Sequence, residues 1–282
     1  MSFADQLSQY VSQVETGINT LLSPGVERPA RLHEAMRYAM QGGGKRLRPV
    51  LLLAAADLFN TKPQNALPAA IAVECVHTYS LVHDDLPCMD DDDLRRGRAT
   101  THKAFDEATA LLTGDALLTQ SFLILSVNYA EQPTVANKLC RELAMAASSR
   151  RLIGGQMEDL LAERKNNASV DELELIHLNK TAAMIEAALV MGGHIGGANA
   201  EDLALLRRAG RHLGLTFQIV DDILDATADT ATLGKTAGKD AMVDKTTYIK
   251  LHGLDKAKSI AEKHTLQAIT ALASLPGDTE FL

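Results

Sequence analysis

The sequence contains no tryptophan, and tyrosine and phenylalanine bring its aromatic content to only 4%. Runs of alternating β-branched residues are also missing, whereas alanine, leucine, methionine and glutamine are plentiful. Because the plentiful residues favour helices and the scarce ones favour strands, we expect an all-α fold. No repeat with a period of roughly 20–50 residues and no low-complexity linker divides the chain. We therefore expect a single helical domain over residues 1–282.

Cysteine is also scarce. Cys75, Cys88 and Cys140 show no CxxC spacing, which argues against a disulfide framework or a thiolate zinc site. A formal net charge of −8 argues against a nucleic-acid partner or an anionic membrane surface. The N-terminal residues lack the basic and apolar regions of a secretory signal, and no apolar run approaches the roughly 18 residues that span a bilayer. We expect a cytoplasmic protein without a membrane span.

Apolar residues recur at spacings of three and four from Phe3 to Leu21, which predicts an opening amphipathic helix. A further helix should run from about Asn65 into an acidic segment, and another from Leu203 to Ala226. We expect the pair Gly154-Gly155 to interrupt a helix that begins at Pro133. Ser169 and Glu172 have the spacing of a capping box.

The acidic segment is the most unusual part of the chain. Six carboxylates fall between Asp84 and Asp93, and Arg95 and Arg96 follow at once. Such a run is more often a solvated loop, but here the largely apolar residues 75–82 lead into it. Crowded carboxylates need a cation, and Mg²⁺ often joins protein carboxylates to substrate phosphates. Arginine forks suit phosphate oxygens, so the segment predicts a metal and phosphate site.

A second acidic cluster comprises Asp221, Asp222 and Asp225. At about 100° per residue, Asp221 and Asp225 lie about 40° apart on a helix, which is unfavourable unless a cation joins them. In the first cluster, Asp84 and Asp90 would point in nearly opposite directions on an unbroken helix. Pro87 should break the helical register so that both can reach one cation cluster. Two facing aspartate clusters with basic residues predict a diphosphate that carries an apolar tail.

Three further patterns are weaker. The segment 43–48 is not a P-loop, because no Ser or Thr follows its lysine and no strand precedes it. Lys45 and Arg48 could grip a diphosphate by charge, although an ordinary basic helix start is about as frequent. Glu174 and His177 form a single ExxH pattern, whereas a di-iron bundle requires two. The glycines of residues 192–197 indicate close helix packing.

Together these segments resemble the trans-isoprenyl diphosphate synthases. Residues 84–90, with Arg95-Arg96, are similar to the first aspartate-rich motif of that family, and residues 221–225 to the second. Other matching positions occur in family order at residues 43–49, His77, Gly114-Asp115, residues 154–156, Lys180-Thr181, Gln218 and Gly234-Lys235. The resemblance implies a homodimer of helical bundles, each around a deep central cavity. Relatives usually continue through another, basic helix, which would follow Phe281-Leu282 and is absent from this sequence.

The resemblance also implies roles for individual residues. Mg²⁺, as three ions once substrate is bound, would be held by Asp84, Asp90 and Asp221, with direct or water-mediated support from Asp85, Asp222 and Asp225. The diphosphate of isopentenyl diphosphate would be held by Lys45, Arg48, His77 and Arg96. The allylic diphosphate would be held by Arg95, Lys180, Lys235 and Lys245. Oxygens near the developing cation would come from Thr181 and Gln218.

The implied reaction is Mg²⁺-dependent head-to-tail condensation of isopentenyl diphosphate with dimethylallyl or geranyl diphosphate, by ionisation, condensation and elimination. In this family, bulk five residues before the first aspartate limits the tail, and Tyr79, followed by Ser80, occupies that place. An aromatic wall suits C15 farnesyl diphosphate, and C20 geranylgeranyl diphosphate is the alternative. A terpene cyclase or a catalytically silent partner subunit fits less well, because both aspartate motifs are intact.

Overall fold

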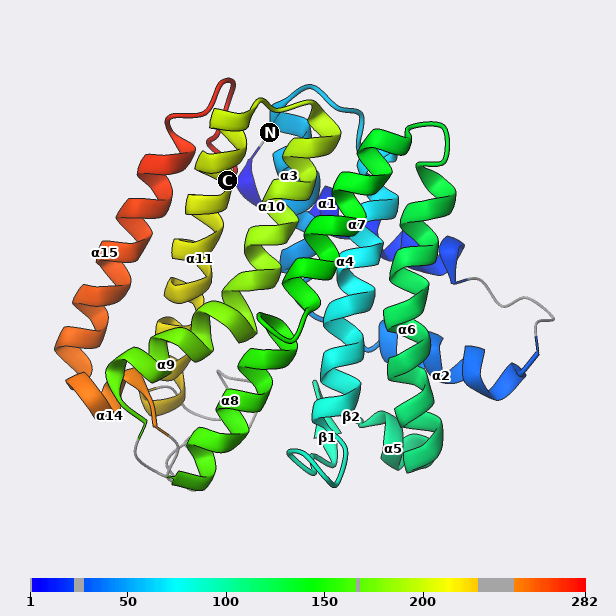
Figure 1. Cartoon of the computed structure of the whole chain (residues 1–282), viewed down its shortest axis with the longest axis vertical. Coiled ribbons are helices and arrows are strands. Elements are labelled where there is room, and N and C mark those ends of the chain that lie inside the picture. Colours follow the sequence, from blue (N-terminus) through cyan, green and yellow to red (C-terminus); the bar gives the residue numbers. More distant parts are fainter. Residues whose placement is uncertain (1, 23–27, 166–167, 228–245) are drawn as a thin grey trace.

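The computed structural model describes residues 2–22, 28–165, 168–227 and 246–282, and these are almost entirely helical (Figure 1). Its α-helices are α1 (Phe3–Leu21), α2 (Ala30–Met40), α3 (Leu47–Leu58), α4 (Pro63–Asp84), α5 (Thr101–Ala104), α6 (Glu107–Asn128), α7 (Pro133–Ala147), α8 (Leu152–Lys165), α9 (Val170–His177), α10 (Ala183–Gly196), α11 (Ala200–Thr227), α14 (Tyr248–His252) and α15 (Leu254–Leu272). The all-α prediction is confirmed.

Two short elements complete the description. A π-helix, η1 (Leu178–Ala182), joins α9 to α10, and a hairpin of β1 (Leu94–Arg95) and β2 (Arg98–Ala99) follows the first acidic segment. The hairpin pairs Leu94 with Ala99 and Arg95 with Arg98. We did not predict the hairpin or the π-helix.

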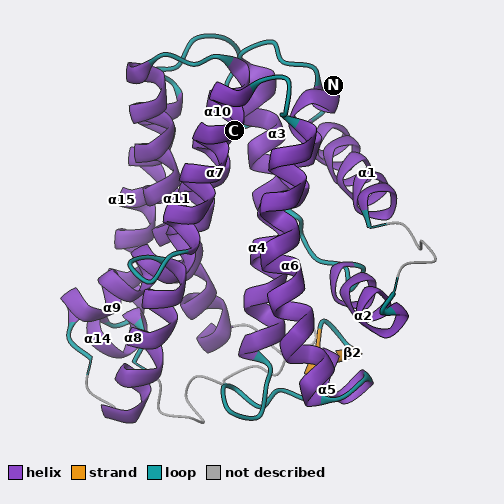
Figure 2. Ribbon diagram, turned by 45° about the vertical axis from the view of Figure 1, so that its right-hand side comes forward, coloured by secondary structure: helices purple, strands orange, loops and turns teal. Residues whose placement is uncertain are grey.

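Helix α4 lies at the centre of the bundle, packed against α3, α6 and α10 (Figure 2). It starts with Pro63, whose missing N–H costs nothing in the first helical turn. Small buried residues such as Ala69, Ala70 and Ala72 surround its axis, as expected for a helix enclosed on all sides. Its C-terminal residue is Asp84, so this central helix ends at the first acidic cluster.

Helix α10 packs between α3, α7 and α11. A Cβ at Gly192 would overlap the carbonyl oxygen of Leu52 on α3, so the glycine permits the close approach that the sequence indicated. Helix α15 lies along α11 (Figure 1). At one end of the bundle the Phe3 ring stacks on the Phe281 ring, with centroids 5.2 Å apart. The acidic segment and the hairpin lie at the opposite end (Figure 1).

The predicted helix boundaries are largely right, with one clear error. Ser169 and Glu172 form the expected capping box at the start of α9. However, Gly154 and Gly155 do not interrupt a helix: α7 ends at Ala147, and both glycines lie in the first turn of α8. Their small size serves packing, because a Cβ at Gly154 would overlap the backbone of Ser149.

Candidate active site

Two neighbouring cavities open at the acidic end of the bundle. The larger one has a volume of about 620 Å³, and aspartates from both acidic clusters, Asp84 and Asp221, line it. Much of its remaining wall is apolar, with side chains from α8, α10 and α11. The smaller cavity, of about 340 Å³, is lined by residues 44–48 and by Glu74. Four residues line both cavities: Arg48, His77, Arg96 and Phe217.

The first aspartate motif adopts the predicted break. Helix α4 stops at Asp84, and a turn follows in which Met89 N–H donates to the Leu86 carbonyl at 2.8 Å. The backbone N–H of Asp90 then donates to the carbonyl of Asp84 at 2.9 Å. The chain therefore turns back on itself, and Asp90 lies beside Asp84 rather than on the far side of a continued helix.

Asp85 points away from the larger cavity and is paired with Arg95. The Nε of Arg95 donates to both carboxylate oxygens of Asp85, at 2.7 and 3.0 Å. The two-residue turn of the hairpin, Arg96-Gly97, has φ values of 55° and 75°. Such left-handed values at both turn positions match the twist of a tight hairpin. The turn directs Arg95 toward the larger cavity and Arg96 toward both.

The smaller cavity gathers the basic residues predicted for isopentenyl diphosphate. Nη1 of Arg96 donates to the carbonyl of Gly43, which connects the hairpin to the glycine-rich segment, residues 43–48. Nη1 of Arg48 lies 3.3 Å from Nε2 of His77. Burial, together with Arg48 and Arg96, lowers the pKa of His77 well below its usual range, so its ring is neutral at pH 7. Lys45 is exposed at the rim.

Arg46 is a site residue to which the sequence analysis gave no role. Its guanidinium is buried and donates to Glu15 at 2.7 Å, to Glu74 at 2.9 Å and to the Met40 carbonyl at 2.7 Å. Although burial lowers the pKa of Arg46, its hydrogen bonds to Glu15 and its contacts with Glu74 raise it overall. Its backbone is left-handed, with φ of 48°, so the side chain turns inward while Lys45 faces the cavity.

Lys180 lies across the larger cavity from the hairpin. Its Nζ is 2.8 Å from a carboxylate oxygen of Asp159 and 3.9 Å from one of Asp84. Gln156 Nε2 also donates to Asp84. Gln156 and Asp159 are three residues apart on α8, so they share one face of that helix. This spacing was readable from the sequence, yet we assigned neither residue a role.

The π-helix places Lys180 and Thr181, and two glycines make room for it. A Cβ at Gly155 of α8 would overlap the backbone N of Lys180, and one at Gly214 of α11 would overlap Ala182. The hydroxyl of Thr181 donates to Oε1 of Gln218 on α11. A widened helical turn often marks a functional site, and here it brings two predicted residues to the cavity wall.

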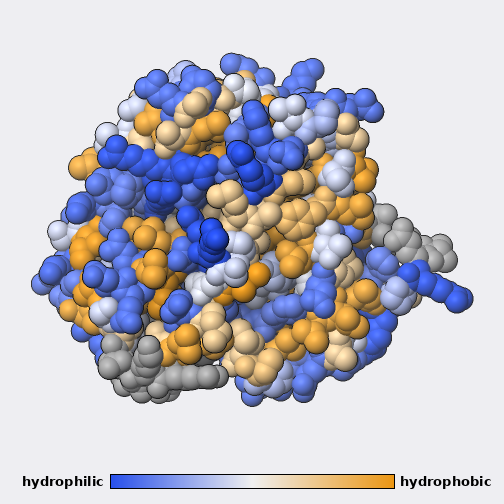
Figure 3. All heavy atoms as spheres, viewed as in Figure 1, coloured by the Kyte–Doolittle hydropathy of each residue, from blue (hydrophilic) through white to orange (hydrophobic). Residues whose placement is uncertain are grey.

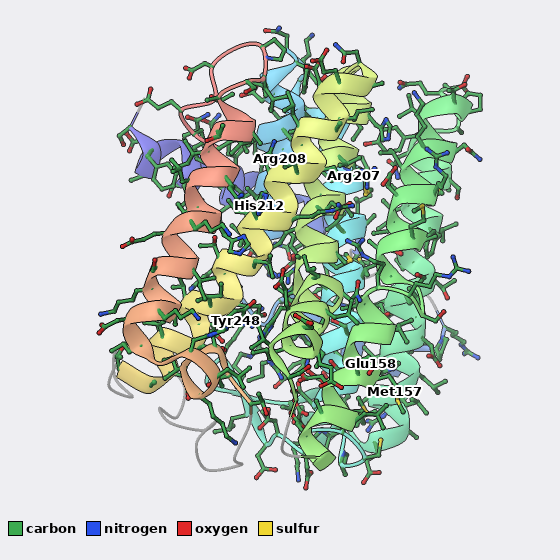
Figure 4. All side chains as sticks on the ribbon, turned by 60° about the vertical axis from the view of Figure 1, so that its left-hand side comes forward. Met157, Glu158, Arg207, Arg208, His212 and Tyr248 are labelled. Carbon is green, nitrogen blue, oxygen red and sulfur yellow. The ribbon has the colours of Figure 1, made fainter. Side chains whose placement is uncertain are left out.

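The second aspartate motif divides its side chains. Asp221 lines the larger cavity, whereas Asp222 and Asp225 are buried. A carboxylate oxygen of Asp222 accepts the backbone N–H of Tyr248 at 2.8 Å, so this aspartate fastens α14 to α11. Tyr248 also stacks on His177, with ring centroids 5.5 Å apart, near the lower end of α11 (Figure 4). The single ExxH histidine is therefore a packing residue.

The residues present fit Mg²⁺. Burial raises the pKa of Asp84 to about 6, and Asp90 adds to this rise while Lys180 opposes it. A bound cation would relieve this crowding of negative charge. No three carboxylate, cysteine or histidine side chains in the described residues gather closely enough to hold a metal alone. The arrangement suits an ion that takes one or two carboxylates and completes its shell with phosphate oxygens and water.

The remaining predicted residues are placed as follows. Tyr79 and Ser80 line the larger cavity from α4, and Tyr79 is only 5% exposed. Lys235 and Lys245 lie outside the described residues. The metal and substrate contacts assigned by resemblance remain predictions.

The family model described as polyprenyl synthetase matches residues 29–276. The chain belongs to this family. A chloroplastic geranylgeranyl pyrophosphate synthase of Catharanthus roseus is 47% identical over 251 residues, which cover 88% of this chain and 70% of that protein. The apo structure of an FPP/GFPP synthase from Zymomonas mobilis has a TM-score of 0.88 at 37% identity, covering 99% and 95% of the two chains.

A geranyltransferase of Helicobacter pylori, solved with magnesium and isoprenyl diphosphate, has a TM-score of 0.82 at 34% identity. The match covers 96% of this chain and 91% of that one. Membership of the polyprenyl synthetase family makes this protein a prenyltransferase of isoprenoid biosynthesis, as the aspartate motifs predicted.

Proposed function

We propose that this prenyltransferase is a Mg²⁺-dependent farnesyl diphosphate synthase, which adds isopentenyl diphosphate to dimethylallyl and then geranyl diphosphate. The observation that carries the proposal is the wall of Arg48, His77, Arg96 and Phe217 shared by two cavities. A condensation needs two diphosphates held side by side, one of them with an apolar tail. The larger cavity suits the allylic substrate, because apolar side chains lie beneath its charged mouth.

The chain's own residues supply the electrostatics. In the larger cavity, Arg95 and Lys180 hold the allylic diphosphate and stabilise the charge that builds on it as its C–O bond ionises. Bound Mg²⁺, held by Asp84, Asp90 and Asp221, would supply Lewis-acid stabilisation of the same leaving group. Lys45, Arg48 and Arg96 hold isopentenyl diphosphate in the smaller cavity.

Carbon–carbon bond formation then takes place at the wall between the two cavities. The alkene of isopentenyl diphosphate, held close to the allylic cation, attacks it. The Oγ of Thr181 and the amide oxygen of Gln218 lie at the cavity wall, where their partial negative charge favours the cation. The proton lost in the last step passes to the released diphosphate. The apolar wall keeps water from the cation.

Product length is the finer part of the proposal. Tyr79 supports a C15 product, because its buried ring lies on the cavity wall five residues before Asp84. A second candidate is a C20 product, and a specific observation favours it. Curated relatives with 42–47% identity to this chain are mainly named geranylgeranyl pyrophosphate synthases.

One assay tests both parts. Purified protein is incubated with Mg²⁺, isopentenyl diphosphate and each of dimethylallyl, geranyl and farnesyl diphosphate, and the products are sized by chromatography. We expect C15 as the end product from the first two starters and little turnover of the third. Efficient extension of farnesyl diphosphate would establish the C20 alternative. Absence of condensation with every starter would refute the proposal.

We also propose that the protein acts as a cytoplasmic homodimer. Among the described residues, α6 is the one helix long and apolar enough to cross a bilayer, and 39% of that window is buried in the bundle. Its outer face exposes Leu112, Leu123 and Val127, which are 51–64% exposed. Figure 3 shows apolar side chains gathered over this part of the surface. A second copy would cover them. Light scattering should give twice the chain mass of 30.3 kDa.

A further inference from the structure

Tyr79, the residue proposed to limit product length, is in contact with His83 of the same helix, α4. His83 follows Tyr79 by four residues, so both lie on one face of the helix, and both line the larger cavity. Their rings meet edge to face, with centroids 5.8 Å apart and planes inclined by 79°. This is the favourable geometry for two aromatic rings. The His83 ring therefore bounds the position that the Tyr79 ring occupies.

Helix α6 holds His83 from the other side. Nε2 of His83 lies 2.9 Å from the carbonyl oxygen of Leu111, and because a carbonyl can only accept, Nε2 carries the proton. Gly114 follows Leu111 by three residues on α6, and its backbone packs against the same ring. A Cβ at Gly114 would overlap Nε2, Cδ2 and Cε1 of His83. The imidazole thus fills a slot between the backbone of α6 and the ring of Tyr79.

Packing alone positions Tyr79 within the part of the chain that the structure describes. Its hydroxyl is buried there without a hydrogen-bond partner, and burial raises the pKa of Tyr79 to about 12. The edge-to-face contact with His83 therefore constrains a ring that has no hydrogen bond to hold it. If His83 moved, the Tyr79 ring could move with it, and the wall of the larger cavity would change shape.

We propose that His83 and Gly114 are specificity-determining residues that set product length through Tyr79. Gly114 fixes the place of the His83 ring, and that ring fixes the place of Tyr79 against the growing prenyl tail. This inference rests on the proposed function, because it requires Tyr79 to limit the tail. It concerns the change in product length between variants and holds for either a C15 or a C20 starting point.

The two positions have opposite expected effects. His83→Ala removes the ring between Tyr79 and α6, so the tail gains space and the product lengthens. Gly114→Ala introduces a methyl group where the ring lies, which pushes His83 toward Tyr79 and the cavity, so the product shortens. In the double variant the new methyl group meets only Ala at position 83. The double variant should therefore lengthen the product as His83→Ala alone does.

The experiment measures the ratio of products that differ by one isoprene unit, at a fixed ratio of the two substrates. Enzyme is used in excess, so that the ratio remains measurable when turnover falls. The matched control is Gly193→Ala on α10, whose Cβ would also meet side-chain ends, Leu206 Cδ1 at 2.5 Å and Leu203 Cδ2 at 3.1 Å. We expect at least a fivefold rise in the longer product for His83→Ala, a fall for Gly114→Ala, and no change for Gly193→Ala.

Tyr79→Ala distinguishes failure of the proposed role of His83 and Gly114 from failure of the proposed function. If it lengthens the product while His83→Ala and Gly114→Ala leave the ratio unchanged, the inference is overturned and the proposed function stands. If Gly114→Ala shortens the product even when His83 is replaced by Ala, the action does not pass through His83, and the inference is overturned as well. Should the wild-type protein condense no substrates, both fail.

Discussion

Arg46 and Glu74 form an ion pair of 2.9 Å in which both side chains are almost fully buried, at 1% and 3% exposure. Arg46 is also bonded to Glu15 of α1, so one guanidinium connects the glycine-rich segment to two helices. Glu74 lines the smaller cavity, where an acid beside a diphosphate would otherwise be unfavourable. Its carboxylate pairs with Arg46, so Lys45 and Arg48 remain as the cations for the proposed diphosphate.

The first prediction concerns this pair. Arg46→Met leaves Glu74 buried without its partner, and removal of one member of a buried pair costs about 3–5 kcal/mol. We expect chemical denaturation to show a decrease of this size in the free energy of unfolding. We also expect a KM for isopentenyl diphosphate raised at least tenfold, because Lys45 and Arg48 lose their fixed positions, while the KM for geranyl diphosphate changes little.

The control is Arg31→Met, which removes an exposed pair with Asp106 and should leave stability and both KM values near wild type. Equal increases in the two KM values of Arg46→Met would show a general loss of structure instead of a disturbed diphosphate grip.

The second prediction concerns Asp159, which holds Lys180 at 2.8 Å. Asp159→Asn removes a charge-assisted hydrogen bond, worth about 1.5–3 kcal/mol, and lets the ammonium group leave its position. The KM for the allylic diphosphate should therefore rise about tenfold or more, since each factor of ten corresponds to about 1.4 kcal/mol. The KM for isopentenyl diphosphate should stay the same.

Glu158→Gln changes the adjacent, exposed carboxylate of α8, labelled in Figure 4, and serves as the matched control. Steady-state kinetics with each substrate varied in turn distinguishes the two variants. A similar KM for the allylic substrate in Asp159→Asn and Glu158→Gln would contradict the role of Asp159.

The third prediction is a pH dependence of stability at the α11–α15 interface. The Nδ1 atoms of His212 (Figure 4) and His264 lie 3.0 Å apart. Burial lowers the pKa of both histidines, and the neighbouring charges of Arg208, Arg211 and Lys263 lower that of His212 further. Below the ordinary value of about 6.5, the unfolded chain therefore binds more protons than the folded one, and stability falls as pH falls.

Denaturation midpoints at pH 7.5 and 5.5 test this sign. We expect the wild type to lose stability between the two values and His264→Gln to lose less. Thr265→Ala alters the next position of α15 without removing a titrating group, so its pH dependence should match that of the wild type. A drop as large in His264→Gln as in the wild type would place the pH sensitivity elsewhere.

The sequence was most informative where a local rule determines the structure. The helix that carries Asp221 and Asp225, the capping box at Ser169 and the helix break between Asp84 and Asp90 each depend on a few neighbouring residues, and the structure has all three. The helical class followed from composition for the same reason.

Features set by distant contacts were harder to predict. The widened turn at Lys180 depends on Gly155 and Gly214, which belong to other helices, so no local pattern indicates it. The hairpin has two residues in each strand, too few for a recognisable alternation. Arg46 stands between Lys45 and Arg48 in the sequence, and only its backbone conformation and the two glutamates distinguish its role from theirs.

The shared wall of Arg48, His77, Arg96 and Phe217 has a consequence for inhibition. A single compound with two anionic head groups and an apolar chain would occupy both cavities and contact these residues from two sides. Its affinity would benefit from the effective concentration of two linked ligands, provided that the linker spans the wall. A substitution in the wall that weakened binding of such a compound would also weaken binding of both proposed substrates. A resistance substitution at this position would therefore reduce the activity of the enzyme.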